Sequence, residues 1–207
     1  MEIRRVGICG SGLMGSGIAQ ACAASGFETI VYEVQRGALD KGLASIRSSL
    51  EKFVEKGKLA SAERDATLAR LRTTTEFDDL AGCDLVVEAI VENMEAKRDL
   101  FARLDALLAP HALICSNTSS LCVIEMAAAT KRSDRIAGLH FFNPVPIMRL
   151  VEVVRTIETS DATIAVLGAF AQRLGKRAVH AKDTPGFVVN RLLVPYLLDA
   201  IRIYEQG

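Results

Sequence analysis

The sequence has no net charge and no hydrophobic run long enough to cross a membrane. Its 207 residues include 25 Lys and Arg and 25 Asp and Glu, which excludes a general electrostatic attraction to nucleic acid or to an anionic membrane. Charges interrupt the apolar stretches before the ~20 residues that a membrane helix needs, and glycines rather than a signal-peptide core follow residues 1–5. These absences predict a soluble, cytoplasmic protein that holds any anionic ligand by local groups.

The chain also lacks the cysteine and histidine spacing of a metal site. Its five cysteines are an odd number without a C-x-x-C pair, and most lie within apolar runs, as is typical of core side chains in a reducing compartment. The histidines, His111, His140 and His180, are scattered, so we expect no bound metal. No G-x-S-x-G elbow is present, which argues against a serine nucleophile.

What the sequence does have is an alternation of strand and helix patterns. Half of its residues are hydrophobic, and short apolar runs alternate with segments of helical spacing from Ile3 to His180. This order predicts an α/β fold with a mostly parallel sheet and helices on both faces. Residues 187–204 then predict a helix that is apolar on much of its circumference and must be covered by another surface. We therefore expect two domains, at residues 1–184 and 185–207.

A glycine-rich turn follows the first predicted strand and opens the first predicted helix. Its sequence fits G-x-G-x-x-G, in which Gly10 permits a tight turn, Gly12 lets a pyrophosphate approach the backbone and Gly15 allows the helix to pack closely on the strand. The start of the helix supplies a local positive field. The turn predicts a dinucleotide site that contains Gly10, Ser11, Gly12, Leu13, Met14 and Gly15.

Glu33 lies at the end of the second predicted strand, about 20 residues beyond the turn. A carboxylate at this position accepts hydrogen bonds from both hydroxyls of an adenosine ribose and repels a 2′-phosphate. Glu33 therefore favours NAD over NADP. Arg36 is close enough in sequence to bind a 2′-phosphate, so the choice of cofactor is not fixed by Glu33 alone.

Three polar clusters follow predicted strands, at residues 88–93, 116–120 and 140–146, where open α/β sheets bind their ligands. His140 is either a general base, because imidazole transfers protons near neutral pH, or a structural histidine. Glu152 lies within an apolar strand pattern. It is either a partner that orients His140 and stabilises its imidazolium, or a surface glutamate on an edge strand.

The second of these clusters offers hydroxyls and an amide in one loop after a strand. Ser119 or Ser120 can serve as the N-cap of a helix predicted over residues 121–129. The same loop can also direct polar groups into the site.

Six segments carry a more specific signal than these features alone. They are Gly10–Ala19, Val86–Asn93 (VVEAIVEN), Ser116–Leu121 (SNTSSL), Gly138–Pro146 (GLHFFNPVP), Leu150–Val154 (LVEVV) and Lys182–Leu193 (KDTPGFVVNRLL). Together they resemble the 3-hydroxyacyl-CoA dehydrogenase family, in particular its short monofunctional branch that includes 3-hydroxybutyryl-CoA dehydrogenases. The resemblance spans nearly the whole chain. It implies a Rossmann-like NAD-binding domain over 1–184 and, over 185–207, the start of a truncated helical domain that forms a homodimer in the full-length protein and covers the acyl group.

The resemblance also implies roles for individual residues. It makes His140 the catalytic base and Glu152 its partner, with Ser119 and Asn190 hydrogen-bonded to the substrate oxygen. The NAD contacts that it implies are Gly10, Ser11, Gly12, Leu13, Met14, Gly15, Glu33, Glu92, Lys97, Asn117, Ser119 and Asn143. The contacts to coenzyme A that it implies are Ser49, Lys56 and Ser119.

We therefore expect an oxidoreductase of fatty acid metabolism that interconverts (S)-3-hydroxyacyl-CoA and 3-oxoacyl-CoA with NAD(H). A dehydrogenase of a small sugar acid, such as gulonate, resembles the same family and shares the His–Glu pair, although Ser49 and Lys56 argue against it. A nucleotide-binding fragment without activity is a further alternative, because the family continues well past Gly207.

Overall fold

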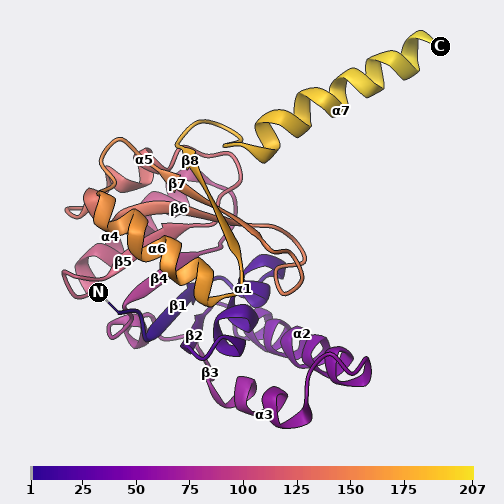
Figure 1. The fold of residues 1–207 in the computed structure, drawn as a ribbon. Coiled ribbons are helices and arrows are strands. Elements are labelled where there is room, and N and C mark those ends of the chain that lie inside the picture. The colour runs from indigo at the N-terminus through magenta and orange to yellow at the C-terminus, as the bar shows by residue number, and fades with distance from the viewer. Residues whose placement is uncertain (1) are drawn as a thin grey trace.

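Eight strands form a single sheet in the order β3-β2-β1-β4-β5-β6-β7-β8 in the computed structural model, which describes residues 2–207 (Figure 1). The strands are β1 (Arg5–Cys9), β2 (Glu28–Tyr32), β3 (Leu71–Thr74), β4 (Leu85–Glu88), β5 (Leu113–Ser116), β6 (Ile136–Phe141), β7 (Leu150–Arg155) and β8 (Arg177–Lys182). The helices are α1 (Leu13–Ala24), α2 (Arg36–Glu55), α3 (Ser61–Ala69), α4 (Met94–Leu107), α5 (Val123–Ala127), α6 (Asp161–Arg173) and α7 (Val189–Gln206), with short 3₁₀ turns η1 (Phe77–Leu80) and η2 (Ser133–Arg135).

The first six strands are parallel, and the sheet then reverses direction. β7 runs antiparallel to β6, and β8 runs parallel to β7. Only residues 142–149 connect β6 to β7. A parallel connection needs about a dozen residues or more, so this segment is too short to carry the chain back to the start of the sheet. β7 therefore begins at the edge of the sheet where β6 ends.

Helices cover both faces because successive strand residues point to opposite sides of the sheet. In β5, Leu113 and Cys115 join the core formed with α1, α2 and α6, whereas Ile114 joins the core formed with α4 and α5. The mostly parallel α/β sheet with helices on both faces, expected from the sequence, is confirmed.

The carboxyl ends of the parallel strands meet at one edge, and the order of the strands creates a crevice there. The chain proceeds outward from β1 to β2 and β3 and then crosses back to β4 on the other side of β1. The connections that follow β1 and β4 thus leave in opposite directions. Such a switch point is where open α/β sheets bind ligands.

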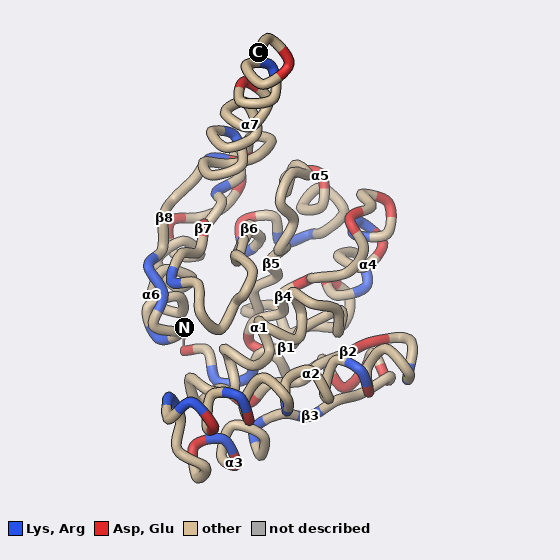
Figure 2. Tube along the Cα trace, turned by 90° about the vertical axis from the view of Figure 1, so that its right-hand side faces the viewer, with Lys and Arg blue, Asp and Glu red and all other residues tan. Residues whose placement is uncertain are grey.

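The helix α7 differs from the others because none of its residues is buried. Figures 1 and 2 show that it extends away from the sheet. The helix predicted over 187–204 begins two residues late, at Val189, and Phe187 is 3% exposed rather than part of the apolar helix surface. Elsewhere, acidic and basic residues are interspersed over α2, α3 and α4 (Figure 2). Within residues 2–207, no helix combines the length and apolar character that crossing a membrane requires.

Candidate active site

The glycine-rich turn between β1 and α1 has no room for a side chain at two of its three glycines. A Cβ on Gly10, whose φ is +100°, would lie 2.5 Å from the Ala89 carbonyl oxygen, and one on Gly15 would lie 1.9 Å from the Gly10 oxygen. A Cβ on Gly12 would meet no protein atom within 4 Å. Gly12 therefore leaves open space before the first amides of α1, where the positive end of the helix stabilises a phosphate.

Glu33 lies half-buried beyond β2 with its carboxylate turned toward this glycine-rich turn. Its Oε2 accepts a hydrogen bond from the Ser11 amide at 3.2 Å and a longer one from the Ser11 hydroxyl at 3.4 Å. Glu33 and Gly12 line one cavity of about 680 Å³. Arg36 forms an exposed ion pair with Asp40 at 3.2 Å. These residues fit an adenosine ribose with free hydroxyls and a pyrophosphate, which are parts of NAD.

His140 and Glu152 face each other on neighbouring strands. They are direct partners in the antiparallel register of β6 and β7, and His140 Nδ1 lies 2.7 Å from Glu152 Oε2. The second oxygen, Oε1, accepts hydrogen bonds from the amides of Val188 at 3.0 Å and Val189 at 2.9 Å. Burial raises the pKa of Glu152, but the hydrogen bonds from His140 and the two amides outweigh it and hold the pKa below its ordinary value. With Nδ1 held by a carboxylate, Nε2 is the nitrogen left for proton transfer.

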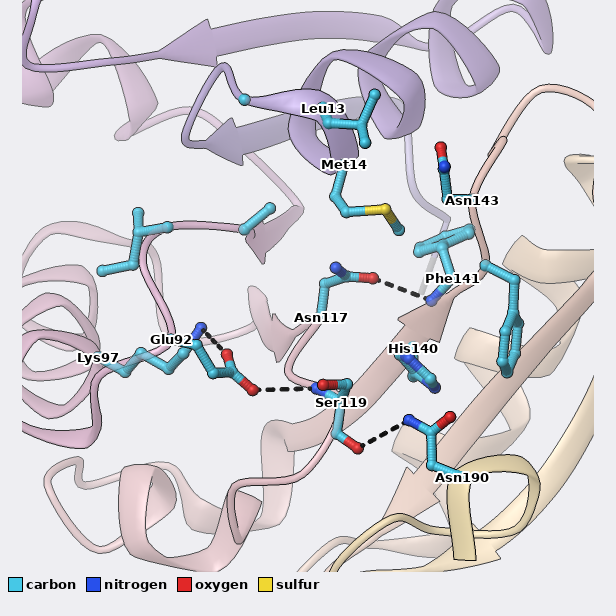
Figure 3. Close-up of a pocket in the computed structure, with 14 residues that line it drawn as sticks. Leu13, Met14, Glu92, Lys97, Asn117, Ser119, His140, Phe141, Asn143 and Asn190 are labelled. Carbon is cyan, nitrogen blue, oxygen red and sulfur yellow. Dashed lines mark hydrogen bonds and ion pairs between the residues drawn. The ribbon is translucent and has the colours of Figure 1, made fainter. Parts of the chain in front are cut away.

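A cavity of about 480 Å³ brings this histidine together with the glycine-rich turn (Figure 3). The residues expected in the site that line this cavity are Gly12, Leu13, Met14, Glu92, Lys97, Asn117, Ser119, His140, Asn143 and Asn190. They come from distant parts of the sequence and meet at the carboxyl edge of the parallel strands. A proton acceptor and a dinucleotide crevice therefore share one cavity.

The loop after β5 links the end of β6, the Glu92 side chain and the Asn190 side chain, all of which line this cavity (Figure 3). Asn117 Oδ1 accepts a hydrogen bond from the Phe141 amide at 2.9 Å, which links the loop to the end of β6. The Ser119 amide donates to Glu92 at 3.2 Å, and the Ser119 carbonyl accepts from the Asn190 side-chain amide at 3.4 Å. Ser119 and Asn190 thus lie side by side near His140.

The N-cap predicted at Ser119 or Ser120 is wrong. The helix α5 begins only at Val123, and its first amides donate to the Asp183 carboxylate, from Val123 at 2.9 Å and from Ile124 at 2.7 Å. Asp183 comes from the segment after β8, 60 residues from Val123, and sequence alone does not show that contact. A distant carboxylate thus caps the helix, and Ser119 instead lines the catalytic cavity.

A closed ring of polar contacts lies beneath the same loop, and we call it the Glu88 ring. Glu88 is fully buried at the end of β4, where it accepts hydrogen bonds from the Lys97 ammonium at 2.5 Å and the Ser116 hydroxyl at 2.6 Å. The Thr118 amide donates to Ser116 Oγ at 3.1 Å, and the Thr118 hydroxyl donates to Glu92 at 2.5 Å. Glu92 closes the ring by an ion pair with Lys97 at 3.2 Å. The ring ties the loop that carries Ser119 to a lysine that is only 1% exposed.

Ser49 and Lys56 lie apart from the catalytic cavity. They line a third cavity, of about 330 Å³, along α2, together with Lys52 and with Ile147 from the connection between β6 and β7. Lysines and a serine hydroxyl suit a phosphate-bearing ligand. The structure does not place these residues with Ser119, so a ligand that contacts all three must be extended.

Residues 5–184 match the family model described as 3-hydroxyacyl-CoA dehydrogenase, NAD binding domain. The chain belongs to the 3-hydroxyacyl-CoA dehydrogenase family. The match covers the glycine-rich turn, Glu33, His140 and Glu152, and it identifies NAD as the cofactor of this 3-hydroxyacyl-CoA dehydrogenase domain. The family and cofactor expected from the sequence are therefore confirmed.

Several proteins of similar sequence or structure carry names from this family. The chain is 48% identical over 211 residues to hydroxyacyl-coenzyme A dehydrogenase, mitochondrial, of Homo sapiens, and the alignment covers 99% of this chain and 67% of that protein. It is 48% identical to the 3-hydroxybutyryl-CoA dehydrogenase of Mycobacterium tuberculosis, with 99% and 72% covered. The crystal structure of (S)-3-hydroxybutyryl-CoA dehydrogenase PaaH1 from Ralstonia eutropha has a TM-score of 0.97 at 43% identity, with 100% and 73% covered.

Three residues of this family member's site were given no role from the sequence, although Glu88 and Thr118 lie in two of the polar clusters expected there. Glu88 ends the buried strand Leu-Val-Val-Glu, and a charge at such a position signals a buried ion pair. Thr118 lies in a loop whose hydroxyls were noted, but its bond to Glu92 depends on a contact 26 residues away. Phe187 could not be recognised from the sequence, because it lies in an apolar run and nothing there indicates its contact with His140.

Proposed function

We propose that this chain interconverts (S)-3-hydroxyacyl-CoA and 3-oxoacyl-CoA with NAD(H), with short acyl chains as in 3-hydroxybutyryl-CoA and acetoacetyl-CoA. The observation that carries the proposal is the His140–Glu152 pair, which adjoins the same cavity as the glycine-rich turn. A general base thus lies next to the place where a dinucleotide fits. The names of the relatives at 48% identity support the substrate class.

In the direction of oxidation, His140 Nε2 accepts the proton of the substrate hydroxyl. Glu152, on the other ring nitrogen, stabilises the positive charge that develops on the imidazole. The Ser119 hydroxyl and the Asn190 amide donate hydrogen bonds to the substrate oxygen and polarise the forming carbonyl. Bound NAD⁺ supplies the hydride acceptor. In the direction of reduction, His140 returns the proton.

The proposal is tested by following NADH absorbance, which falls as acetoacetyl-CoA or a longer 3-oxoacyl-CoA ester is reduced and rises if gulonate is oxidised with NAD⁺. We expect turnover of the CoA esters, with acetoacetyl-CoA among the best, and none with gulonate and NAD⁺. Faster turnover of gulonate would favour the sugar-acid alternative. Absence of turnover with every CoA ester would exclude the proposed function.

Cofactor choice gives a separate prediction. Because Glu33 accepts from ribose hydroxyls and would lie against a 2′-phosphate, we expect kcat/KM to be about 100-fold or more higher for NADH than for NADPH. The Glu33→Ala variant should narrow that ratio, since it removes the repulsion. Steady-state kinetics with both cofactors measures this, and equal or better use of NADPH by the unaltered protein would overturn the assignment.

We further propose that the cavity on α2 binds the phosphate-bearing end of coenzyme A. Ser49 and Lys56 line it with Lys52, and the charge of these lysines complements phosphate. Ser119 contacts the opposite, reacting end of the same extended substrate. This division favours a CoA ester over a small sugar acid, which is too short to use both cavities.

Lys56→Met should therefore raise KM for acetoacetyl-CoA by about tenfold and leave kcat nearly unchanged, because a contact kept throughout the reaction affects binding alone. Lys41→Met is the matched control, since Lys41 is exposed on α2, the helix that Lys56 directly follows. Acetoacetyl-pantetheine, which lacks the nucleotide end, should show no response to Lys56→Met. Equal KM values for the two lysine variants would count against this phosphate site.

We propose residues 1–184 as the NAD-binding domain and residues 185–207 as the start of a helical domain that carries the contact of a homodimer. The helix α7 supports this division, because its large apolar side chains are exposed, among them Leu192 at 70% and Ile203 at 68%. Apolar surface of this extent is stabilised by a protein partner.

We also propose a reducing, cytoplasmic location. The five cysteines are free thiols, and four of them are buried. Burial raises the pKa of Cys22 to about 12 and that of Cys83 to about 12, which keeps these thiols protonated and unreactive. Thiols of this kind are typical of proteins from reducing compartments.

A further inference from the structure

The turn between β8 and α7 has a backbone conformation that one of its residues does not favour. Gly186 has a φ of +78° and Phe187 a φ of +47°. Glycine adopts this left-handed region freely, whereas a bulky L-residue rarely does. Phe187 is the one residue other than glycine with a positive φ in the described range 2–207. Such strain persists where the surrounding contacts impose it.

The Phe187 side chain packs against the candidate base. It is 3% exposed, and its ring centroid lies 5.7 Å from that of His140, with the planes at 60°. The ring centroid of Phe142, the residue after β6, lies 4.5 Å from that of the same imidazole, with the planes at 58°. The χ2 torsion of histidine has broad preferences, so the hydrogen bond to Glu152 and packing against the ring together fix its plane. Two phenyl rings from different segments supply that packing.

The residues after Phe187 reach the other member of the pair. The amides of Val188 and Val189 both donate to Glu152 Oε1, while Oε2 meets the imidazole. The directions of these two N–H bonds depend on the dihedral angles of Phe187, which precedes them. One turn thus contacts His140 through a side chain and Glu152 through the backbone.

We propose that Phe187 is a positioning residue of the dehydrogenase site, whose ring fixes the plane of the His140 imidazole and whose left-handed backbone directs the Val188 and Val189 amides onto Glu152. Phe187 acts through these groups, since it is not among the residues that line the catalytic cavity. The kinetic consequence rests on the proposed function. The orientation of the imidazole does not, and it can be measured without turnover.

If Phe187 only packed in the core and did not position His140, its replacement would have different effects. Phe187 also belongs to the core beside α4 and α5, so its replacement would lower stability in either case. If packing were its whole role, a variant that still folds would keep the imidazole orientation and the kcat of the unaltered protein. Kinetics and histidine spectra therefore separate the two roles.

Phe187→Leu keeps an apolar side chain and removes the ring. We expect kcat with acetoacetyl-CoA to fall on the order of 10- to 100-fold, as misplacement of a reacting group does, while KM for NADH stays within about twofold. Phe170→Leu is the matched control, because Phe170 is also buried and packs against an aromatic ring, Phe27, at 5.0 Å. It should keep the kcat of the unaltered protein.

Nitrogen NMR of histidine-labelled protein gives the second readout. The chain has three histidines, and the His140 signals are those absent from His140→Gln. We expect Phe187→Leu to change the His140 nitrogen shifts, and Phe170→Leu to leave them unaltered. Phe187→Gly, which suits a φ of +47° and lacks the ring, should resemble Phe187→Leu and serves if the leucine variant does not fold.

Unaltered His140 shifts and kcat in the folded Phe187 variants would overturn the proposal. If the unaltered protein turns over no CoA ester, the proposed function fails, and the NMR comparison still decides whether Phe187 positions the imidazole.

Discussion

His140→Gln should lower kcat for acetoacetyl-CoA by about 10²–10⁴-fold, the loss typical of removing a general acid–base catalyst. Glutamine has no group that takes up or returns a proton near neutral pH, so the reduction would have to draw its proton from water. The affinity for NADH should change little, because the glycine-rich turn and Glu33 lie on other elements. Steady-state kinetics and a fluorescence titration with NADH measure the two effects separately.

Glu152→Gln should act in the same direction. The pKa of Glu152 lies below its ordinary value, so the side chain is charged at neutral pH, and its neutral replacement no longer stabilises the imidazolium. His180→Gln is the matched control, because His180 is exposed on β8. If His140→Gln retained near-normal turnover, His140 would have no part in the proton transfer.

Glu88→Ala should lower the free energy of unfolding by roughly 3–5 kcal/mol, as loss of one partner of a buried ion pair does. Lys97 is 1% exposed and would keep only the more exposed Glu92 as its counter-charge. The Ser116 hydroxyl would lose its acceptor as well. Chemical denaturation followed by circular dichroism measures the change.

A double variant tests whether the charge pair itself is responsible. Glu88→Leu combined with Lys97→Met removes both charges and should recover part of the stability lost in Glu88→Leu alone. Asp40→Ala, which breaks the exposed pair with Arg36, should leave unfolding unchanged. A loss below about 1 kcal/mol in Glu88→Ala would show that the Glu88 ring is not a major source of stability.

Local features of the fold could be predicted from the sequence because hydrophobic period and glycine position determine them. The first helix opens at the glycine-rich turn as predicted, at Leu13, whereas the helices predicted over 121–129 and 187–204 each begin two residues later than predicted. The start of α7 could not be predicted. Gly186 and Phe187 have positive φ angles, which keep them out of the helix, and hydrophobic periodicity does not indicate such angles. The reversal at β7 was open to prediction, since residues 142–149 are too few for a crossover.

The site was predictable in its residue types and less so in its contacts. The sequence left Glu152 as either a partner of His140 or a surface residue of an edge strand. The structure excludes the second interpretation, because β7 lies inside the sheet and Glu152 is fully buried. The choice depended on strand register, which one sequence does not contain. The burial of Lys97 could not be predicted either, since it depends on the Glu88 carboxylate of β4 lying below α4.

The reversal of the sheet at β7 also bears on how the site assembles as the chain folds. His140 and Glu152 are 12 residues apart in sequence, whereas Ser119 and Asn190 are 71 apart. Closing the longer loop costs about 1.6 kcal/mol more in chain entropy, by the logarithmic dependence on loop length. The base and its carboxylate can therefore pair while much of the chain is still disordered. The contact between Ser119 and Asn190 has the larger entropic cost, because it closes the loop that contains β6, β7 and β8.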